Sequence, residues 1–175
     1  MVTIDPLMVI TIFILAGFTL KLTDFYGEHR TGYATYIITL FSAFFFTLLI
    51  SESEYSSAIA IGIIVGVFLS GKVNRPNLIF GLVLTLIFAL FIGFVFPNQI
   101  VIPVSIFAFV DEILHEKFGN RFKSLKNFFQ FRPILKIAII LLFLLNWLPL
   151  MYFIGFFCFD LSYDLTSKVL LKEKN

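Results

Sequence analysis

Residues 59–69 read IAIGIIVGVFL and residues 137–145 read IAIILLFLL, so each stretch is apolar on every side of a regular element. A strand that crosses a membrane would alternate polar and apolar residues over about ten positions, and neither stretch does so. A helix satisfies its own backbone hydrogen bonds in an apolar solvent. The two stretches therefore predict an all-α membrane protein.

The composition of the whole chain leads to the same prediction. Of the 175 residues, 59% are hydrophobic and only 14% are charged, a balance that a soluble domain cannot expose to water. Apolar stretches fill almost the whole length, at residues 7–20, 33–50, 57–70, 78–96, 100–110 and 134–159. We expect a polytopic transmembrane helix bundle of five to six spans, built by a single integral membrane domain over residues 1–175. This leaves no room for a nucleic-acid-binding domain.

The last apolar stretch has an interruption at residues 146–149, Asn-Trp-Leu-Pro. Proline removes a backbone donor and kinks or breaks a helix. The preferred interpretation is one kinked span over 134–159, and the alternative is a hairpin that turns back at the proline. Only the hairpin would bring Asp160 and Asp164 to the face that holds the other charges.

Basic residues follow alternate apolar stretches. Lys and Arg occur in residues 21–32, 71–77 and 111–133, whereas the N-terminus and the two other loops have none. Loops rich in Lys and Arg stay in the cytoplasm. The pattern predicts a plasma-membrane protein with its N-terminus outside and these three loops in the cytoplasm.

The segment after the fifth apolar stretch is basic, rich in phenylalanine and amphipathic. Such helices lie in the membrane interface and attract anionic lipid head groups. We expect an interfacial helix over about residues 112–131, with head groups bound along residues 117–132. A basic connector that only anchors the chain would show much the same pattern.

An acidic cluster, DEILHE at residues 111–116, is the strongest candidate for chemistry. Carboxylate oxygens and an imidazole on one helix turn suit a divalent cation, and the oxygen ligands favour Mg²⁺ or Mn²⁺. The first cytoplasmic loop supplies further carboxylates. The metal ligands predicted are Asp111, Glu112, His115, Asp24 and Glu28. Ion pairs with Lys72, Arg75 or Arg121, or plain solvation, are the alternative.

A second candidate is the basic loop GKVNRP at residues 71–76, with Arg30 in the neighbouring loop. Guanidinium and ammonium groups bind phosphate strongly. Lys72, Arg75 and Arg30 are therefore predicted to hold a phosphate head group. Two basic residues in a cytoplasmic loop are also what membrane topology alone requires.

These patterns lead to one main hypothesis and two alternatives. The main hypothesis is a metal-dependent enzyme that acts on a lipid or isoprenoid-phosphate head group at the cytoplasmic face. Its catalytic candidates are Asp111, Glu112, His115 and Glu116. The first alternative is a substrate-binding or permease subunit of a transporter. The second is a structural or assembly subunit that packs against a partner membrane protein through the Gly62-x-x-x-Gly66 motif.

Overall fold

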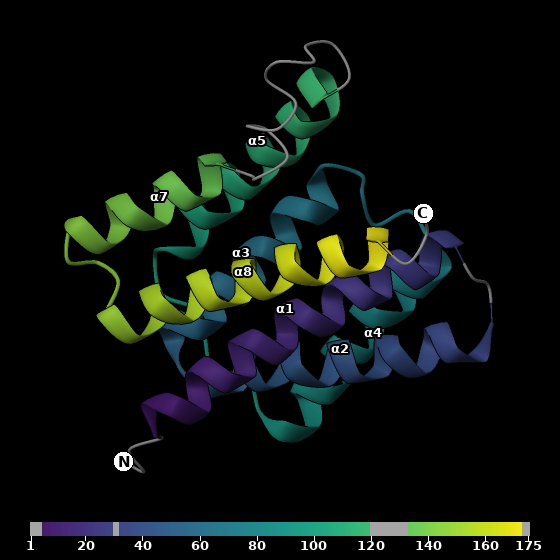
Figure 1. Cartoon of the computed structure of the whole chain (residues 1–175). Coiled ribbons are helices and arrows are strands. Elements are labelled where there is room, and N and C mark those ends of the chain that lie inside the picture. Colours follow the sequence, from purple (N-terminus) through teal and green to yellow (C-terminus); the bar gives the residue numbers. More distant parts are fainter. Residues whose placement is uncertain (1–4, 30–31, 120–132, 173–175) are drawn as a thin grey trace.

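The computed structural model describes residues 5–29, 32–119 and 133–172, and only the backbone at 115–119 and 171–172. All regular structure in these ranges is helical, which confirms the predicted all-α class. The helices are α1 (Pro6–His29), α2 (Tyr33–Glu52), α3 (Glu54–Leu69), α4 (Pro76–Ile92), α5 (Val101–Gly119), α7 (Pro133–Leu144) and α8 (Leu150–Lys172) (Figure 1).

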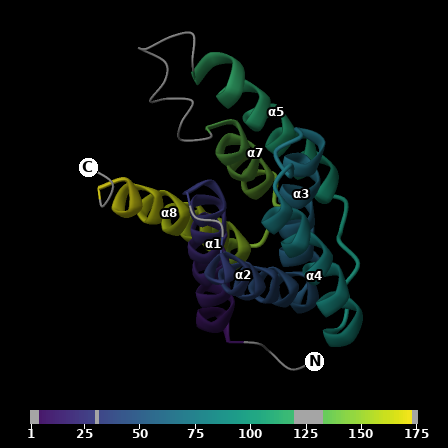
Figure 2. The ribbon, with the colours of Figure 1, turned by 90° about the vertical axis from the view of Figure 1, so that its right-hand side faces the viewer.

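Most of the helices pack in a closed ring, and α4 lies outside it. The neighbours around the ring are α1, α2, α3, α5, α7 and α8, and α8 returns to α1 (Figure 2). α3 also touches α8 across the ring, while α4 packs against α2 and, less extensively, against α1. Because successive helices run in opposite directions, alternate connections meet at the same end of the bundle.

Serine and proline set several helix ends. Ser53 ends α2 and caps α3, since the Ser56 amide donates to Ser53 Oγ and the Ser53 amide donates to Ser56 Oγ, both at 3.1 Å. This reciprocal capping satisfies amides that the first helical turn leaves without partners. Pro76 opens α4, where its missing N–H costs nothing.

Two helices have limits that differ from the predicted spans. α1 continues from the apolar stretch 7–20 as far as His29, so Lys21, Asp24 and Glu28 lie on a helix and not in a loop. α4 ends at Ile92 because Gly93 adopts a φ of 125°, which leaves the helical region. The charged residues of α1 are therefore held by a rigid element.

The last apolar stretch forms a hairpin, so the preferred single kinked span is wrong. Asn146 adopts a left-handed φ of 59°, and the Trp147 amide donates to the Leu142 carbonyl at 3.0 Å, which ends α7. Asparagine is one of the few residues that adopt this conformation readily. Lys136 Nζ then lies 2.8 Å from Asp160 Oδ2, whereas one continuous helix would separate these residues by about 36 Å.

The fifth apolar stretch continues as one helix well past Asp111. α5 runs without a break from Val101 to Gly119, so the first part of the predicted interfacial helix 112–131 belongs to α5. The rest of that prediction, including head-group binding along 117–132, falls on side chains outside the described residues.

Length and composition identify two helices that could cross a membrane, α1 and α2. Three shorter apolar helices accompany them, α3, α4 and α7. The coarser expectation of apolar, membrane-compatible helices is therefore met, and the number of spans is taken up below as a proposal.

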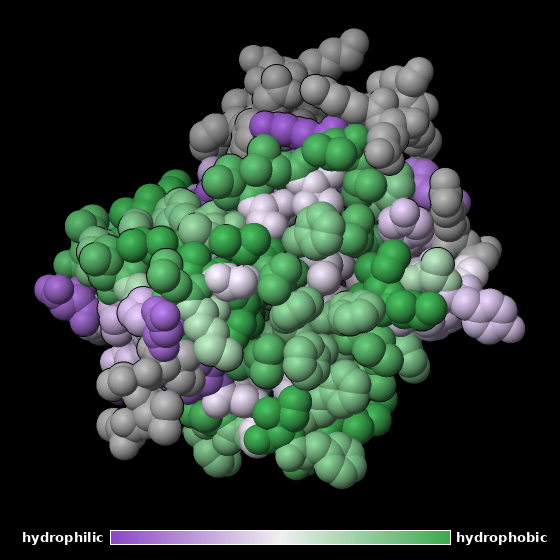
Figure 3. Space-filling view, turned by 60° about the horizontal axis from the view of Figure 1, so that its bottom comes forward, coloured by the Kyte–Doolittle hydropathy of each residue, from purple (hydrophilic) through white to green (hydrophobic). Residues whose placement is uncertain are grey.

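Buried and exposed positions are distributed in a way that is unusual for a protein in water. Hydroxyl side chains lie in the interior, and Thr47, Ser56 and Ser57 have no exposed surface. Large apolar side chains are exposed on the described part of every helix, and Leu90 and Phe91 of α4 are each 85% exposed. Figure 3 shows one such face, where hydrophobic residues cover most of the surface and hydrophilic ones lie toward its margins. Soluble proteins rarely expose apolar patches of this extent.

Candidate functional site

Ionisable side chains gather at one end of the bundle, where α1 and α8 end and α4 and α7 begin. We call this the charged end. Its described members are Lys21, Asp24, Glu28, Lys72, Arg75, Asp111, Glu112, Lys136, Asp160 and Asp164. At the opposite end the turn between α2 and α3 carries Glu52 and Glu54, and Tyr152 of α8 donates to Glu52 Oε1 at 3.2 Å.

Arg75 is the centre of the first half of the charged end. Its Nη2 lies 2.7 Å from Glu28 Oε1 and its Nη1 lies 3.5 Å from Asp24 Oδ1. The Arg75 side chain remains 34% exposed, so water reaches these pairs. One cation that two carboxylates share at a solvated edge can exchange them for another anion at modest cost.

Asn77 fixes the position of Arg75 relative to α1. Asn77 is 5% exposed, and its Nδ2 donates to the Thr23 carbonyl at 2.9 Å. Gly27 makes room for it, because a Cβ at Gly27 would lie 2.5 Å from the Asn77 amide nitrogen. The start of α4 is thereby held against α1, and Arg75 is placed beside the α1 carboxylates.

Tyr163 brings α8 to the same group of residues. Its hydroxyl donates to Asp24 Oδ2 at 3.5 Å, and Lys21 Nζ lies 5.0 Å from the centre of its ring. Lys21 Nζ also lies 3.2 Å from Asp24 Oδ2. Asp24 therefore contacts groups from α1, α4 and α8.

Asp111 lies buried against the start of α7. It is 2% exposed and its carboxylate accepts from the Leu135 amide at 3.0 Å and the Ile134 amide at 3.4 Å. These amides belong to the first turn of α7, where a carboxylate satisfies donors without helical partners and opposes the positive end of the helix dipole. Asp111 thus caps a neighbouring helix across the bundle.

Lys136 joins the two arms of the hairpin. Its Nζ lies 2.8 Å from Asp160 Oδ2 and 3.7 Å from Asp164 Oδ2, with the three side chains between 17% and 25% exposed. The carboxylates set aside by the single-span interpretation are therefore part of the charged end.

The predicted metal ligands do not come together as one group. Asp24 and Glu28 lie on α1 and pair with Arg75. Asp111 and Glu112 lie on α5 and are buried, at 2% and 4% exposure. Within the described residues no three His, Cys, Asp or Glu side chains are placed to hold one metal ion. The side chains of His115 and Glu116 lie outside the described part of the chain.

The predicted phosphate set is divided in the same way. Arg75 lies at the charged end beside Asp24 and Glu28, and Lys72 precedes it in the same connection. Arg30 falls outside the described residues. Of the predicted phosphate-binding residues, Arg75 is the one whose side-chain contacts are described, at the start of α4.

The Gly62-x-x-x-Gly66 motif packs α3 against α5 within the chain. A Cβ at Gly62 would lie 2.5 Å from Val104 Cγ1, and one at Gly66 would lie 2.5 Å from Ala108 Cβ. Small residues at this spacing allow helix backbones to approach closely. The motif considered for contact with a partner protein is therefore used by α5.

Comparison with known protein families, with curated proteins and with solved structures found no match.

Sequence reasoning missed Asn77 and Thr23, which the structure places at the contact between α1 and α4. Asn77 carried a usable signal, because an amide side chain directly after a helix-starting proline opens an otherwise apolar stretch. Thr23 carried none, since threonine is common in apolar helices and usually bonds to its own backbone.

Proposed function

We propose that this chain is a multi-pass integral membrane protein whose charged end faces the cytoplasm. The supporting observation is the distribution of polarity, with hydroxyls buried and large apolar side chains exposed on the described part of every helix. Hydroxyl groups that bond within their own helix cost little in lipid, whereas an apolar exterior is unfavourable in water. α1 to α5 make five spans in this proposal. α3 and α4, with 16 and 17 residues, require local thinning of the bilayer.

The α7–α8 hairpin adds a re-entrant element to these spans. α7 has 12 residues, which reach about 18 Å against a ~30 Å hydrocarbon core. Tyr152 beside the turn nevertheless contacts Glu52 at the opposite end of the bundle, so the bilayer would be thin at the hairpin as well. α7 would then begin and α8 would end on the cytoplasmic side, where Lys136 pairs with Asp160. This arrangement also keeps Lys168 and Lys172 in the cytoplasm, as the distribution of basic residues requires.

Single cysteines at opposite ends of the bundle test this topology. Asn74 and Gln99 are both exposed, in the α3–α4 and α4–α5 connections. In a Cys158→Ala background, a membrane-impermeant maleimide should label Gln99→Cys in intact cells and Asn74→Cys only after permeabilisation. Equal labelling of both in intact cells, or recovery of the protein from the soluble fraction, would overturn the proposal.

We further propose that the charged end recognises the phosphate head group of a lipid or isoprenoid phosphate. The observation that favours this function is Arg75, which is held at the start of α4 by Asn77 and shared by two partly exposed carboxylates. Phosphate and guanidinium form paired, charge-assisted hydrogen bonds stronger than one exposed ion pair. Lys72, three residues before Arg75 in the same connection, carries a second positive charge.

A divalent cation fits this proposal on the side of α1. When phosphate takes Arg75, Glu28 loses its cation and Asp24 keeps only Lys21, so Asp24 and Glu28 would hold Mg²⁺ or Mn²⁺, which would supply positive charge beside the phosphate. Asp111 is an unsuitable ligand because it already caps α7. Catalytic roles for Asp111, Glu112, His115 and Glu116 stay predictions, and turnover that survives alanine at Glu112 and His115 would rule out the roles of these two residues.

Ligand-dependent stability in an uncharged detergent tests head-group recognition. Octyl phosphate with Mg²⁺ should raise the melting temperature, while octanol should not, because only the phosphate engages Arg75. A ligand at a hundredfold excess over Kd stabilises the folded state by about 2.7 kcal/mol. Arg75→Gln should abolish the shift and Lys168→Gln, an exposed basic residue on α8, should retain it. An unchanged shift in Arg75→Gln would contradict the proposal.

A further inference from the structure

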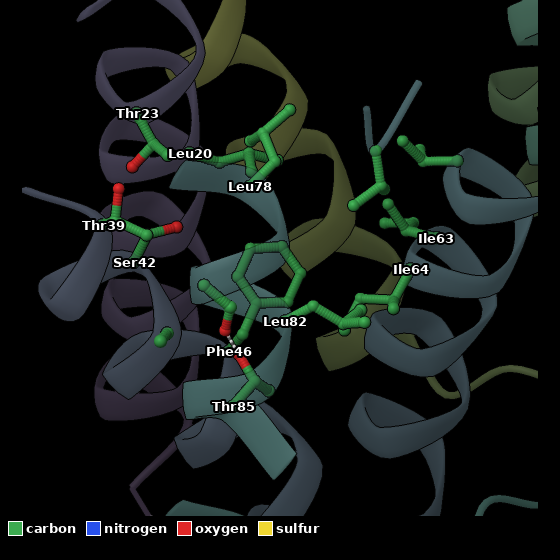
Figure 4. Close-up of a pocket in the computed structure, with 14 residues that line it drawn as sticks. Leu20, Thr23, Thr39, Ser42, Phe46, Ile63, Ile64, Leu78, Leu82 and Thr85 are labelled. Carbon is green, nitrogen blue, oxygen red and sulfur yellow. Dashed lines mark hydrogen bonds between the residues drawn. The ribbon is translucent and has the colours of Figure 1, made fainter. Parts of the chain in front are cut away.

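A cavity of about 110 Å³ lies between α1, α2, α3 and α4, and no predicted site residue lines it. Its wall is mostly apolar, with Phe46 from α2, Ile63 from α3 and Leu82 from α4 (Figure 4). An engineered apolar cavity of about 150 Å³ binds benzene. The space therefore suits a small apolar group or a few carbons of a chain.

The polar groups of the cavity lie at one end of it. Figure 4 shows the hydroxyls of Thr23, Thr39 and Ser42 gathered near Leu78, away from Thr85. Thr85 is already bonded, because its hydroxyl donates to the Gly81 carbonyl at 2.9 Å. The hydroxyl end of the cavity is the end nearest the start of α4, which gives the cavity an amphipathic character.

Thr23 at this end has a buried hydroxyl without a partner among the described residues. It is 2% exposed, and its Oγ1 makes no hydrogen bond. Buried threonines elsewhere in the bundle donate to the carbonyl four residues earlier, namely Thr19, Thr39, Thr47, Thr85 and Thr166, at 2.7–2.9 Å. An unsatisfied buried hydroxyl is costly, so a group in the cavity that accepts from it would be stabilised.

The cavity lies where α3 and α4 are held apart, and several residues that line it are close to Arg75 or Asp24 in the sequence. α2 packs against both of these helices, while α3 and α4 have at most a marginal contact with each other. Ile64 of α3 and Leu78 of α4, both half-buried, line the cavity on this side. Thr23 adjoins Asp24 in the sequence, and the lining residues Val73 and Leu78 lie on either side of Arg75. An apolar group inside the cavity would therefore have its polar end at the Arg75–Asp24 pair.

From this arrangement we infer that the cavity binds the first carbons of an isoprenoid or acyl chain, whose ester or phosphoester oxygen accepts a hydrogen bond from the Thr23 hydroxyl. The chain enters laterally between α3 and α4, and the head group extends to Arg75. The site of the head group rests on the proposed function, whereas the cavity and its hydroxyl end do not.

Two cavity variants test the inference. Ala43 of α2 lines the cavity and is 2% exposed, so Ala43→Leu fills it. Thr23→Val removes the hydroxyl and keeps the shape. The matched control is Ala34→Leu, at an exposed position of the same helix. The probes are inorganic phosphate, octyl phosphate and geranyl phosphate, titrated by calorimetry below their micelle concentrations.

We expect Ala43→Leu to weaken the binding of octyl phosphate or geranyl phosphate at least tenfold. The affinity for inorganic phosphate should not change. Thr23→Val should weaken the binding of the chain-bearing probes about five- to tenfold, because one hydrogen bond is lost. This variant still tests the inference if Ala43→Leu fails to fold. The probe that binds more tightly identifies the chain as isoprenoid or acyl. Equal affinity of both probes for wild type, Ala43→Leu and Thr23→Val would overturn the inference.

The outcomes for the cavity and for the head-group proposal differ. Loss of chain-dependent binding in Ala43→Leu, together with no effect of Arg75→Gln, supports the cavity and rejects the head-group site. Loss of inorganic phosphate binding in Arg75→Gln, with chain binding intact in both cavity variants, supports the head-group site and rejects the cavity.

Discussion

The two sides of α3 show how residue size determines where a bundle closes. On one side Gly62 and Gly66 let α5 approach until their missing Cβ atoms would touch Val104 and Ala108. On the other side Ile63 and Ile64 face a cavity that separates α3 from α4. Close backbone approach leaves no volume for a ligand, while larger side chains hold the neighbouring helix away and leave space between them. We refer to these as the closed side and the open side of α3.

The largest effect is expected on the closed side. Gly66→Leu should destabilise the fold by about 3 kcal/mol, because the added atoms meet Ala108 and the backbone of α5, which cannot yield as a side-chain end does. The free energy of unfolding can be measured by SDS titration in mixed micelles. Phe68→Leu, at an exposed position of α3, is the control. A tolerated Gly66→Leu would show that the closed side is not tightly packed.

A second prediction concerns how α5 is held on its other flank. Asp111→Ala should cost about 2 kcal/mol, because two amides in the first turn of α7 lose a buried charged acceptor. Asp111→Asn keeps an acceptor oxygen and should cost about half as much. The same SDS titration measures both. Stability equal to wild type in Asp111→Ala would leave the alternative that the carboxylate serves a ligand.

On the open side of α3, a larger residue is expected to raise the stability of the protein. Ala43→Leu places added carbons in the cavity, and burying them should stabilise the empty protein by up to about 1 kcal/mol. Thermal unfolding without added ligand is the measurement, with Ala34→Leu as the exposed control. A loss of several kcal/mol would show that the open side is as closely packed as the other one.

The smallest effect is expected at Thr23. Thr23→Val removes a buried hydroxyl that has no partner among the described residues, so the empty protein should gain about 0.5 kcal/mol. Thr39→Val is the matched comparison, because it removes a hydroxyl that donates to Thr35, and it should gain nothing. A loss of stability in Thr23→Val would indicate that its hydroxyl is bonded.

The sequence predicted the helical class and most helix positions, because runs such as 59–69 can form only helices. It also indicated which connections gather charge, since Lys and Arg follow alternate helices. The hairpin was not decided by the sequence, because Pro149 permits both a kink and a turn. The left-handed Asn146 and the pairing of Lys136 with Asp160 select the turn.

The candidate site was less predictable than the fold. Asp111 and Asp24 look alike in the sequence, since each precedes a second acid and a histidine within a helical turn or two. Tertiary contacts separate them, because Asp111 meets the amides of α7 and Asp24 meets Arg75. The cavity depends on how four helices, α1 to α4, pack together, and no local spacing encodes it.

The contact between α1 and α8 has a consequence for how the protein is made. Gly17 allows the α1 backbone to meet Phe159, and Phe13 of α1 lies against Gly155. The ribosome makes α1 before α8, so α1 waits for this neighbour until the helices between them have been made. The ring closes in one late step. A chain cut before residue 150 would leave this face of α1 uncovered and would lack Asp160 and Asp164, the carboxylates that pair with Lys136.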